Sequence, residues 1–115
     1  MITYRQATVL DLPVLVSLDR EYFPDTAWPI EQFRDEIGGK TRNFLIAEDS
    51  GEIIAYAGAF LPAVGGEGDI MTIAVNPKFR RTGIAKELIA RLEGWAAARG
   101  AIAMMLEVDV SNRSE

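Results

Sequence analysis

The sequence contains no cysteine and no histidine among its 115 residues. The lack of cysteine excludes disulfide bonds, a cysteine nucleophile and a zinc site with cysteine ligands. The lack of histidine removes the serine–histidine–aspartate triad, the most common metal ligand and the usual general base. Acid–base chemistry in this chain must therefore use carboxylates, tyrosine, lysine or water, and we expect no metal site.

Positive charge is also scarce, because 12 Lys and Arg stand against 17 Asp and Glu, a net charge of −5. This balance argues against nucleic-acid binding, which needs a basic face, and is compatible with a cationic partner. No apolar run approaches the ~20 residues of a membrane-spanning helix, and the N-terminus lacks a signal-peptide pattern. We therefore expect a cytoplasmic protein that makes no membrane contact and forms a single domain over residues 1–115.

Apolar periodicity and turn residues predict the element order β-α-α-β-β-β-α-β. The predicted strands span 2–5, 43–48, 52–61, 69–75 and 101–108, and the predicted helices run from 8 or 11 to about 20, from 29 to 37, and over 83–99. Proline is tolerated only in the first turn of a helix, so Pro13 favours the later start, and Pro29 suits the first turn of the second helix. The segment 49–51 (Asp-Ser-Gly) predicts a hairpin. Hairpin-linked strands followed by one parallel crossover predict an α/β domain with a mixed, mostly antiparallel sheet flanked by helices.

A cationic turn joins the predicted strand at 69–75 to the predicted long helix. Four positive side chains and no acidic one lie between positions 78 and 86, namely Lys78, Arg80, Arg81 and Lys86. A helix N-terminus offers unpaired backbone N–H groups and a partial positive charge, and Gly83 lets a ligand approach the backbone closely. These features suit a pyrophosphate, although a plain solvated strand–loop–helix has the same charges.

The residues from Arg80 to Ala85 (RRTGIA) match the pattern Q/R-x-x-G-x-G/A, and with it the chain resembles the GNAT N-acetyltransferase superfamily. Asn76-Pro77, Leu106-Glu107-Val108 and Ser111-Asn112 are similar to the RimI-type branch, which acetylates the N-terminal residue of a ribosomal protein. The resemblance implies the GNAT fold (the acyl-CoA N-acyltransferase fold) without its C-terminal helix and hairpin. It also implies that acetyl-CoA, the cosubstrate, lies between the predicted strands 69–75 and 101–108.

The same resemblance implies a role for individual residues. The implied cofactor-binding residues are Ile73, Ala74 and Val75 for the pantetheine arm, Arg80, Arg81, Thr82, Gly83, Ile84, Ala85 and Lys86 for the pyrophosphate, and Asn112 near the thiol. Glu107 matches the general base of the RimI-type branch, with Glu67 and Asp69 as alternative bases and a solvent-facing strand carboxylate as the plain interpretation. That branch also has a tyrosine several residues after the Ser-Asn segment, and this sequence has no tyrosine between Asn112 and Glu115.

The implied function is acetyl transfer from acetyl-CoA to the N-terminal α-amine of a protein of the ribosomal type. The alternatives are a small-molecule amine as acceptor, an acetyl-CoA-binding module without turnover, and an interaction domain in which RRTGIA is coincidental. The predicted last strand, 101–108 (AIAMMLEV), would be an exposed apolar edge, and such edges associate. We therefore expect a homodimer or strand exchange to cover it.

Overall fold

The structure is a computed structural model that describes residues 1–106 of the chain. Its elements in chain order are β1 (Ile2–Gln6), the 3-10 helix η1 (Val9–Asp11), α1 (Leu12–Tyr22), α2 (Ile30–Glu36), β2 (Arg42–Asp49), β3 (Glu52–Phe60), β4 (Glu67–Val75), the 3-10 helix η2 (Pro77–Phe79), α3 (Ile84–Ala98) and β5 (Ala103–Leu106). The predicted order of strands and helices is therefore confirmed. The two sizeable shifts are in β4, which begins two residues before the predicted strand, and in β5, which begins two residues after it.

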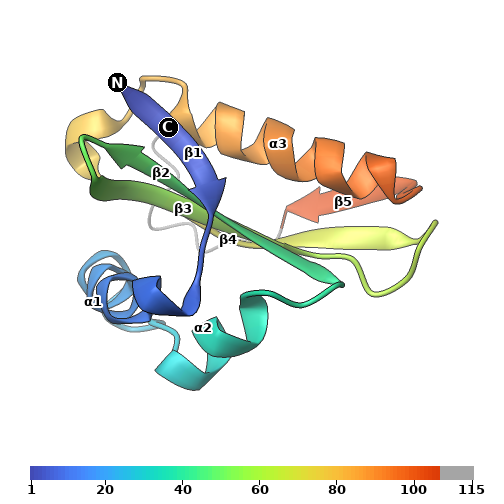
Figure 1. Ribbon diagram of the computed structural model, residues 1–115, viewed down its shortest axis with the longest axis horizontal. Coiled ribbons are helices and arrows are strands. Elements are labelled where there is room, and N and C mark those ends of the chain that lie inside the picture. Colours follow the sequence, from blue (N-terminus) through green and yellow to red (C-terminus); the bar gives the residue numbers. More distant parts are fainter. Residues whose placement is uncertain (107–115) are drawn as a thin grey trace.

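The five described strands form one sheet in the order β1-β2-β3-β4-β5 (Figure 1). The first three pairings are antiparallel, and β4 and β5 are parallel. The predicted mixed, mostly antiparallel sheet is confirmed. The hairpin between β2 and β3 turns through Ser50 and Gly51, whose φ angles of 53° and 83° are those that a tight two-residue turn requires.

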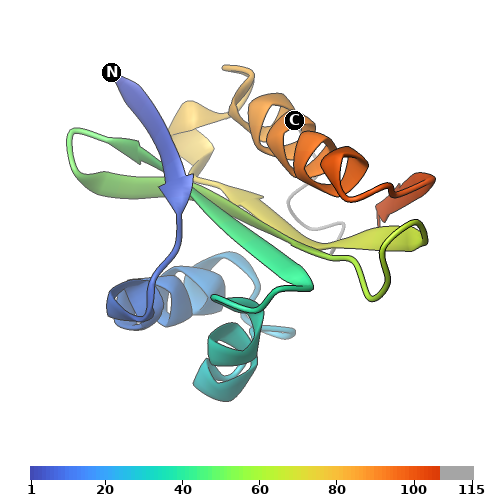
Figure 2. The ribbon, with the colours of Figure 1, turned by 45° about the vertical axis from the view of Figure 1, so that its right-hand side comes forward.

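Helices cover both faces of the sheet, with α1 and α2 on one face and α3 on the other (Figures 1 and 2). The face toward α1 and α2 is aromatic: the buried rings of Phe33, Phe44 and Tyr56 pack together with centroids 5.8–6.3 Å apart. The face toward α3 carries small side chains, because alternate strand residues project to opposite faces. The alanines on this face are Ala47, Ala55, Ala57 and Ala59. They let α3 lie close to the strands, where Leu88 and Leu92 become fully buried.

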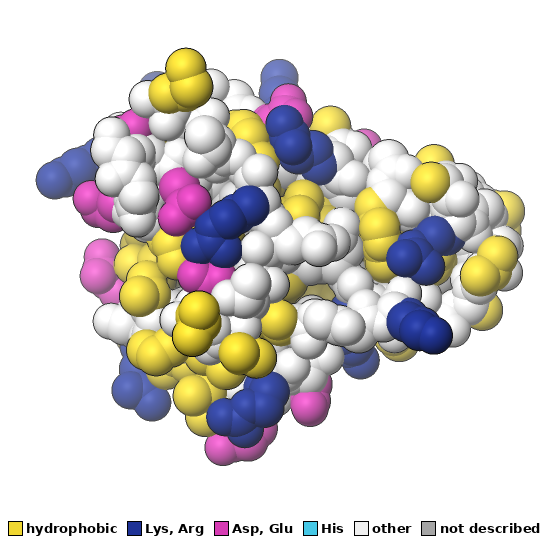
Figure 3. All heavy atoms as spheres, viewed as in Figure 1, with side chains coloured by type: hydrophobic (Ala, Val, Ile, Leu, Met, Phe, Trp, Pro, Cys, Tyr) yellow, Lys and Arg dark blue, Asp and Glu magenta, His cyan; other side chains and the backbone are white. Residues whose placement is uncertain are grey.

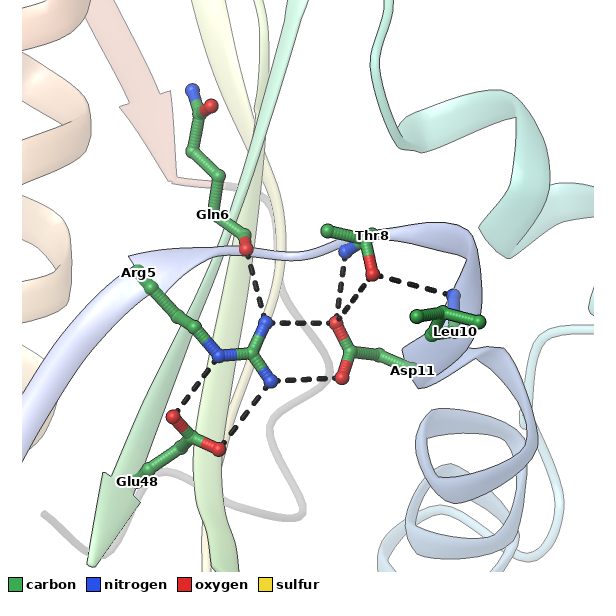
Figure 4. Close-up of polar contacts among 6 residues, drawn as sticks. All are labelled: Arg5, Gln6, Thr8, Leu10, Asp11 and Glu48. Carbon is green, nitrogen blue, oxygen red and sulfur yellow. Dashed lines mark hydrogen bonds and ion pairs between the residues drawn. The ribbon is translucent and has the colours of Figure 1, made fainter. Parts of the chain in front are cut away.

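A charged cluster fixes the start of α1 relative to the sheet (Figure 4). The Arg5 guanidinium on β1 donates to both carboxylate oxygens of Asp11, at 2.9 and 2.8 Å, and to Glu48 on β2 at 3.0 Å. The Thr8 N–H also donates to Asp11 Oδ2 at 2.8 Å. The hydrogen bonds from Arg5 hold the pKa of Asp11 below its usual value. Asp11 therefore joins β1, η1 and β2 just before α1 begins.

The later of the two predicted starts of α1 is correct, and Asp11 occupies the N-cap position of this helix. Pro13 lies in the first turn of α1, as expected for the later start. The Asp11 side chain makes no capping hydrogen bond to α1, because its oxygens accept from Arg5 and Thr8 instead. Pro29 also differs slightly, since it occupies the N-cap position of α2 and not its first turn.

Most of the large apolar side chains that are exposed lie in two places, and Met1, Val64 and Ile102 are exposed besides them. In Figure 3, hydrophobic side chains gather at the lower left, where α1 lies in Figure 1, and Val9, Leu10 and Val14 of η1 and α1 are exposed. The second place is β5, the last strand of the described sheet, where Met105 and Leu106 are about half exposed. The expectation that a second copy covers this strand stays a prediction.

Candidate functional site

The turn between β4 and α3 is held by its own side chains and by two left-handed residues. Asn76 Oδ1 accepts a hydrogen bond from the Lys78 N–H at 2.9 Å, and the Thr82 hydroxyl donates to the Phe79 carbonyl. Arg81 and Gly83 have φ angles of 64° and 84°. The left-handed conformation is costly for a non-glycine residue such as Arg81, and backbone strain of this kind gathers at ligand-binding sites.

The first turn of α3 leaves backbone donors without a partner in the helix. The first helical hydrogen bond runs from the Glu87 N–H to the Gly83 carbonyl at 3.0 Å. The N–H groups of Ile84, Ala85 and Lys86 therefore precede the helical ladder, and Gly83 at the N-cap has no side chain to accept from them. Together with the helix dipole, these donors favour an anion at this position.

A hollow of about 220 Å³ lies at this end of α3 and is lined by Arg81, Gly83, Ala85 and Lys86. All four are sequence-predicted site residues, and two of them are cationic. The side chain of Ile84 is buried in the core under α3, so only its backbone N–H can serve the hollow. The nearest acid in the sequence, Glu87, forms an ion pair with Arg91 at 2.7 Å. The hollow is therefore lined by positive charge and lies at the first turn of α3.

The second half of β4 has one side without a described strand partner. Residues Ile73, Ala74 and Val75 pair with β3 on their other side. β5 pairs only with the stretch from Glu67 to Ile70, so within residues 1–106 no strand pairs with 71–75 on the β5 side. At the paired end, β4 and β5 lie close together. A Cβ atom on Gly68 of β4 would be only 2.6 Å from the sulfur of Met104 on β5.

A cavity of about 270 Å³ opens beside this unpaired stretch, between β4 and the helical layer. Three segments line it. The lining residues are Asp19 in α1, Phe23 directly after α1, Thr26 and Trp28 in the connection to α2, and Met71 and Thr72 in β4. The register shift between β3 and β4 leaves Met71 without an opposite residue, because Ile70 faces Ala59 and Thr72 faces Gly58. This bulge bends β4 at the edge of the cavity.

Asp19 is the buried charge of this cavity, with a relative exposure of 3%. Its Oδ1 accepts a hydrogen bond from the Tyr56 hydroxyl at 2.5 Å, and its Oδ2 accepts one from the Trp28 N–H at 2.8 Å. Burial and the adjacent Asp19 carboxylate raise the pKa of Tyr56, so this hydroxyl keeps its proton. The arrangement fixes a carboxylate against aromatic side chains.

Asp19 is not among the sequence-predicted site residues, although the sequence contains a signal for it. Leu12, Leu15 and Asp19 follow the helical spacing i, i+3, i+7, so a carboxylate stands in the apolar stripe of α1. An acid at a core-facing position has to find buried donors. That requirement distinguishes Asp19 from the solvent-exposed acids of the chain.

The remaining sequence-predicted residues fall in three groups. Arg80 and Thr82 lie in the same turn but are not among the residues that line the hollow. Glu67 and Asp69 lie in the paired half of β4 and line neither the hollow nor the cavity. Glu107 and Asn112 lie outside the described residues.

No group of three or more carboxylates lies close enough to hold a metal ion within residues 1–106. None of the described helices is both long enough and apolar enough to cross a membrane.

Residues 12–115 match the acetyltransferase (GNAT) family. The chain belongs to this family. Among curated relatives, the amino-acid acetyltransferases of Ectopseudomonas mendocina and Azotobacter vinelandii are each 32% identical over 96 residues, which is 84% of this chain and 22% of theirs. The chain thus spans about a fifth of the length of these relatives.

Solved structures give the same fold. The ribosomal-protein-S18-alanine N-acetyltransferase of Escherichia coli superposes with a TM-score of 0.81 at 24% identity, over 97% of this chain and 70% of that one. An acetyltransferase of Clostridium acetobutylicum solved with acetyl-CoA superposes with a TM-score of 0.77 at 24% identity, over 93% and 80%. The expected GNAT fold is confirmed. These relatives differ in the acceptors that their names give, so they do not assign one to this GNAT domain.

Proposed function

We propose that this chain transfers an acetyl group from acetyl-CoA to an amine, with the CoA pyrophosphate bound at the start of α3. The observation that carries the proposal is the hollow at the start of α3, which is lined by Arg81 and Lys86 and lies at the turn where the N–H groups of 84–86 precede the helical ladder. A pyrophosphate matches both kinds of donor. Family membership supports the same assignment.

The pantetheine arm would lie along the side of β4 that faces away from β3. Ile73, Ala74 and Val75 would contact it through main-chain groups, as an added strand does. In this position the thioester would approach the cavity that contains Asp19, because Thr72 lines that cavity and precedes Ile73. Asn112 would lie near the thiol.

The chemistry requires a neutral amine, a polarised thioester carbonyl and an acceptor for the amine proton. We propose Glu107 as the general base, and Glu67 and Asp69 as the alternatives within the described residues. A backbone N–H from 73–75 would stabilise the negative charge that develops on the carbonyl oxygen. The new N–C bond forms as the C–S bond breaks, and the amine proton passes to the base. CoA leaves as the thiolate, which then takes up a proton from water. Direct attack fits a chain without cysteine or histidine.

We propose a protein N-terminal α-amine, of the ribosomal-protein type, as the acceptor. An α-amine has a pKa near 8, against about 10.4 for lysine, so near pH 7 about a tenth of it is neutral. The buried carboxylate of Asp19 and the aromatic side chains of Phe23 and Trp28 would attract the cationic end of a basic acceptor. A small-molecule amine is the second candidate, because the cavity volume of about 270 Å³ is closer to one residue than to a peptide.

Exchange of single charges tests the cofactor site. Arg81→Gly keeps the left-handed turn and removes the guanidinium, since glycine adopts this φ without strain. We expect Arg81→Gly and Lys86→Gln each to weaken CoA binding by about tenfold in calorimetry, as for lost hydrogen bonds to a charged group. Lys78→Gln is the matched control, because Lys78 is a cation of the same turn that does not line the hollow, and it should change affinity less than twofold. Equal losses in all three variants would contradict the assignment.

A panel of acceptors tests the reaction. CoA release is measured with acetyl-CoA and a peptide with a free N-terminus, the same peptide blocked at its N-terminus but carrying a lysine, a free amino acid, and an aminoglycoside. The proposal expects turnover with the free peptide N-terminus and none with the blocked one. Glu107→Gln should then leave CoA binding near normal and lower turnover. Saturable acetyl-CoA binding without release of CoA to any acceptor would indicate a binding module.

A further inference from the structure

A second hollow, of about 140 Å³, lies at the other end of α3 from the proposed CoA site. Its lining comes from four parts of the chain: the end of β1, the connection after α2, the start of β2 and the end of α3. The lining residues that matter below are Gly38, Gly39, Arg42, Asn43, Trp95 and Arg99. A helix of 15 residues such as α3 is about 22 Å long. The two hollows are therefore separate sites.

A buried amide is the first sign that this hollow receives a ligand. Asn43 has a relative exposure of 7%, and its Oδ1 accepts a hydrogen bond from Gln6 Nε2 at 3.1 Å. Its Nδ2 group donates no hydrogen bond to any residue of the described chain, although it belongs to a residue that lines the hollow. The residue as a whole is buried, but this amide group is not among the unpartnered atoms that the described chain buries completely, so it reaches the hollow. Two N–H bonds of Asn43 are thus available to a group in the hollow.

Two arginines give the hollow its charge. Arg42 is held by an ion pair with the buried Glu36 and lies 4.2 Å from the centre of the Phe60 ring. Arg99 lies 5.1 Å from the centre of the Trp95 ring and is exposed. Glu36 balances Arg42, so Arg99 supplies the net positive charge, and no acidic side chain is among the lining residues of the described hollow.

The end of α3 does not cancel this charge. The carbonyls of the last turn, at Ala96 and Ala97, accept hydrogen bonds from the N–H groups of Arg99, Gly100 and Ala101. Partnered carbonyls present less negative potential than open ones. Gly38 and Gly39 contribute no side chains, and a Cβ atom on either would have no neighbour within 4 Å. The hollow is therefore open at one side and rich in donors at the other.

We propose that this hollow binds a small oxyanion, either a carboxylate or a phosphoryl group, through the Asn43 amide and the guanidinium groups of Arg42 and Arg99. Planar guanidinium groups and amide N–H groups are the usual donors to such anions. The volume, about 140 Å³, fits a ligand of a few heavy atoms and is well below the ~300 Å³ of a typical drug-sized pocket. A bound anion would lie between the connection after α2 and the end of α3.

The test is a titration of the 15N-labelled chain with inorganic phosphate and, separately, with acetate, at constant ionic strength set with sodium chloride. The proposal expects saturable shifts of the Asn43 side-chain NH2 and the Arg99 Nε–H resonances. Binding of phosphate at the proposed CoA site is followed through other resonances, those of the backbone amides of 84–86. A response to phosphate alone or to acetate alone identifies which of the two anions the site takes.

Arg99→Gln and Arg91→Gln make a matched pair of variants. Both arginines lie at exposed positions near the surface of α3 and stack on an aromatic ring, at 5.1 Å for Arg99 and at 4.5 Å for Arg91 on Tyr4. We expect Arg99→Gln to raise the dissociation constant at the Asn43 resonance at least fivefold, and Arg91→Gln to change it less than twofold. Shifts that stay linear to high anion concentration, or equal effects of the two variants, would overturn the proposal.

Discussion

Replacing Gly83 by alanine should destabilise the protein, whereas the same replacement at Gly94 should stabilise it. Both glycines belong to α3 or its N-cap, and an added Cβ atom at either position would have no heavy atom within 4 Å. Packing is therefore equal in the two variants. They differ in backbone conformation, because Gly83 has φ +84° and Gly94 lies inside the helix.

The expected magnitudes follow from this difference. A residue with a Cβ atom costs about 1–2 kcal/mol in the left-handed region, so Gly83→Ala should lower the free energy of unfolding by that amount. Alanine in a helix interior is about 0.5–1 kcal/mol better than glycine, so Gly94→Ala should raise it. The two variants should differ by about 1.5–3 kcal/mol in urea unfolding followed by circular dichroism.

Binding gives the second measurement on the same pair. A residue that leaves the left-handed region at position 83 re-aims the N–H groups of 84–86, so CoA affinity should fall at least tenfold, about 1.4 kcal/mol. Gly94→Ala should bind CoA within twofold of the unchanged chain. The reasoning is refuted if both exchanges shift stability in the same direction, or if Gly83→Ala binds CoA normally.

Two further predictions concern stability. Because Arg5 holds the pKa of Asp11 below its usual value, the stabilisation by Asp11 is complete above the unfolded pKa of about 3.9 and is lost as pH falls through the lower folded pKa. Asp11→Asn should therefore lower the free energy of unfolding in urea by about 1–2 kcal/mol at pH 7 and by progressively less below pH 4. The control is Asp49→Asn, which removes an exposed ion pair with the N-terminus and should lower the free energy of unfolding little at either pH. Gly58→Ala places a Cβ atom 2.6 Å from the ring of the buried Phe44 and should cost about 1–3 kcal/mol. Phe44→Leu in the same chain should relieve part of that cost, and purely additive losses would contradict the steric explanation.

The strands and helices could be predicted because their signals are local. The hairpin at 49–51, the proline in the first turn of α1 and the apolar stripe of α3 each depend on residues within a few positions of one another. The exact contacts at the ends of elements could not be predicted. Asp11 lies at the N-cap of α1, but its carboxylate accepts from Arg5 on β1 and makes no hydrogen bond to the helix, and that pairing follows only from the packing of β1 against η1.

The same distinction separates the two parts of the candidate site. The hollow at α3 was predictable because Arg81, Gly83 and Lys86 lie in one short segment whose spacing fixes the turn. The cavity was not predictable, because it joins Asp19 to Thr72, residues far apart in the sequence that only the finished sheet brings together. The Asn43 hollow is of the same kind, since Arg99 comes from the other end of the chain.

The proposed division of labour explains how one fold can serve different acceptors. On the CoA side, the proposed contacts are mainly backbone groups at 73–75 and 84–86, which depend on conformation and tolerate exchange of side chains. On the acceptor side, the cavity is built from side chains, among them Asp19, Phe23 and Trp28, so each exchange changes its shape or charge. The relatives described above carry names that share acetyl transfer and differ in the acceptor, an amino acid in two of them and a ribosomal protein in another. Exchanges at positions 23 and 28 should therefore alter the choice of amine and leave CoA affinity unchanged.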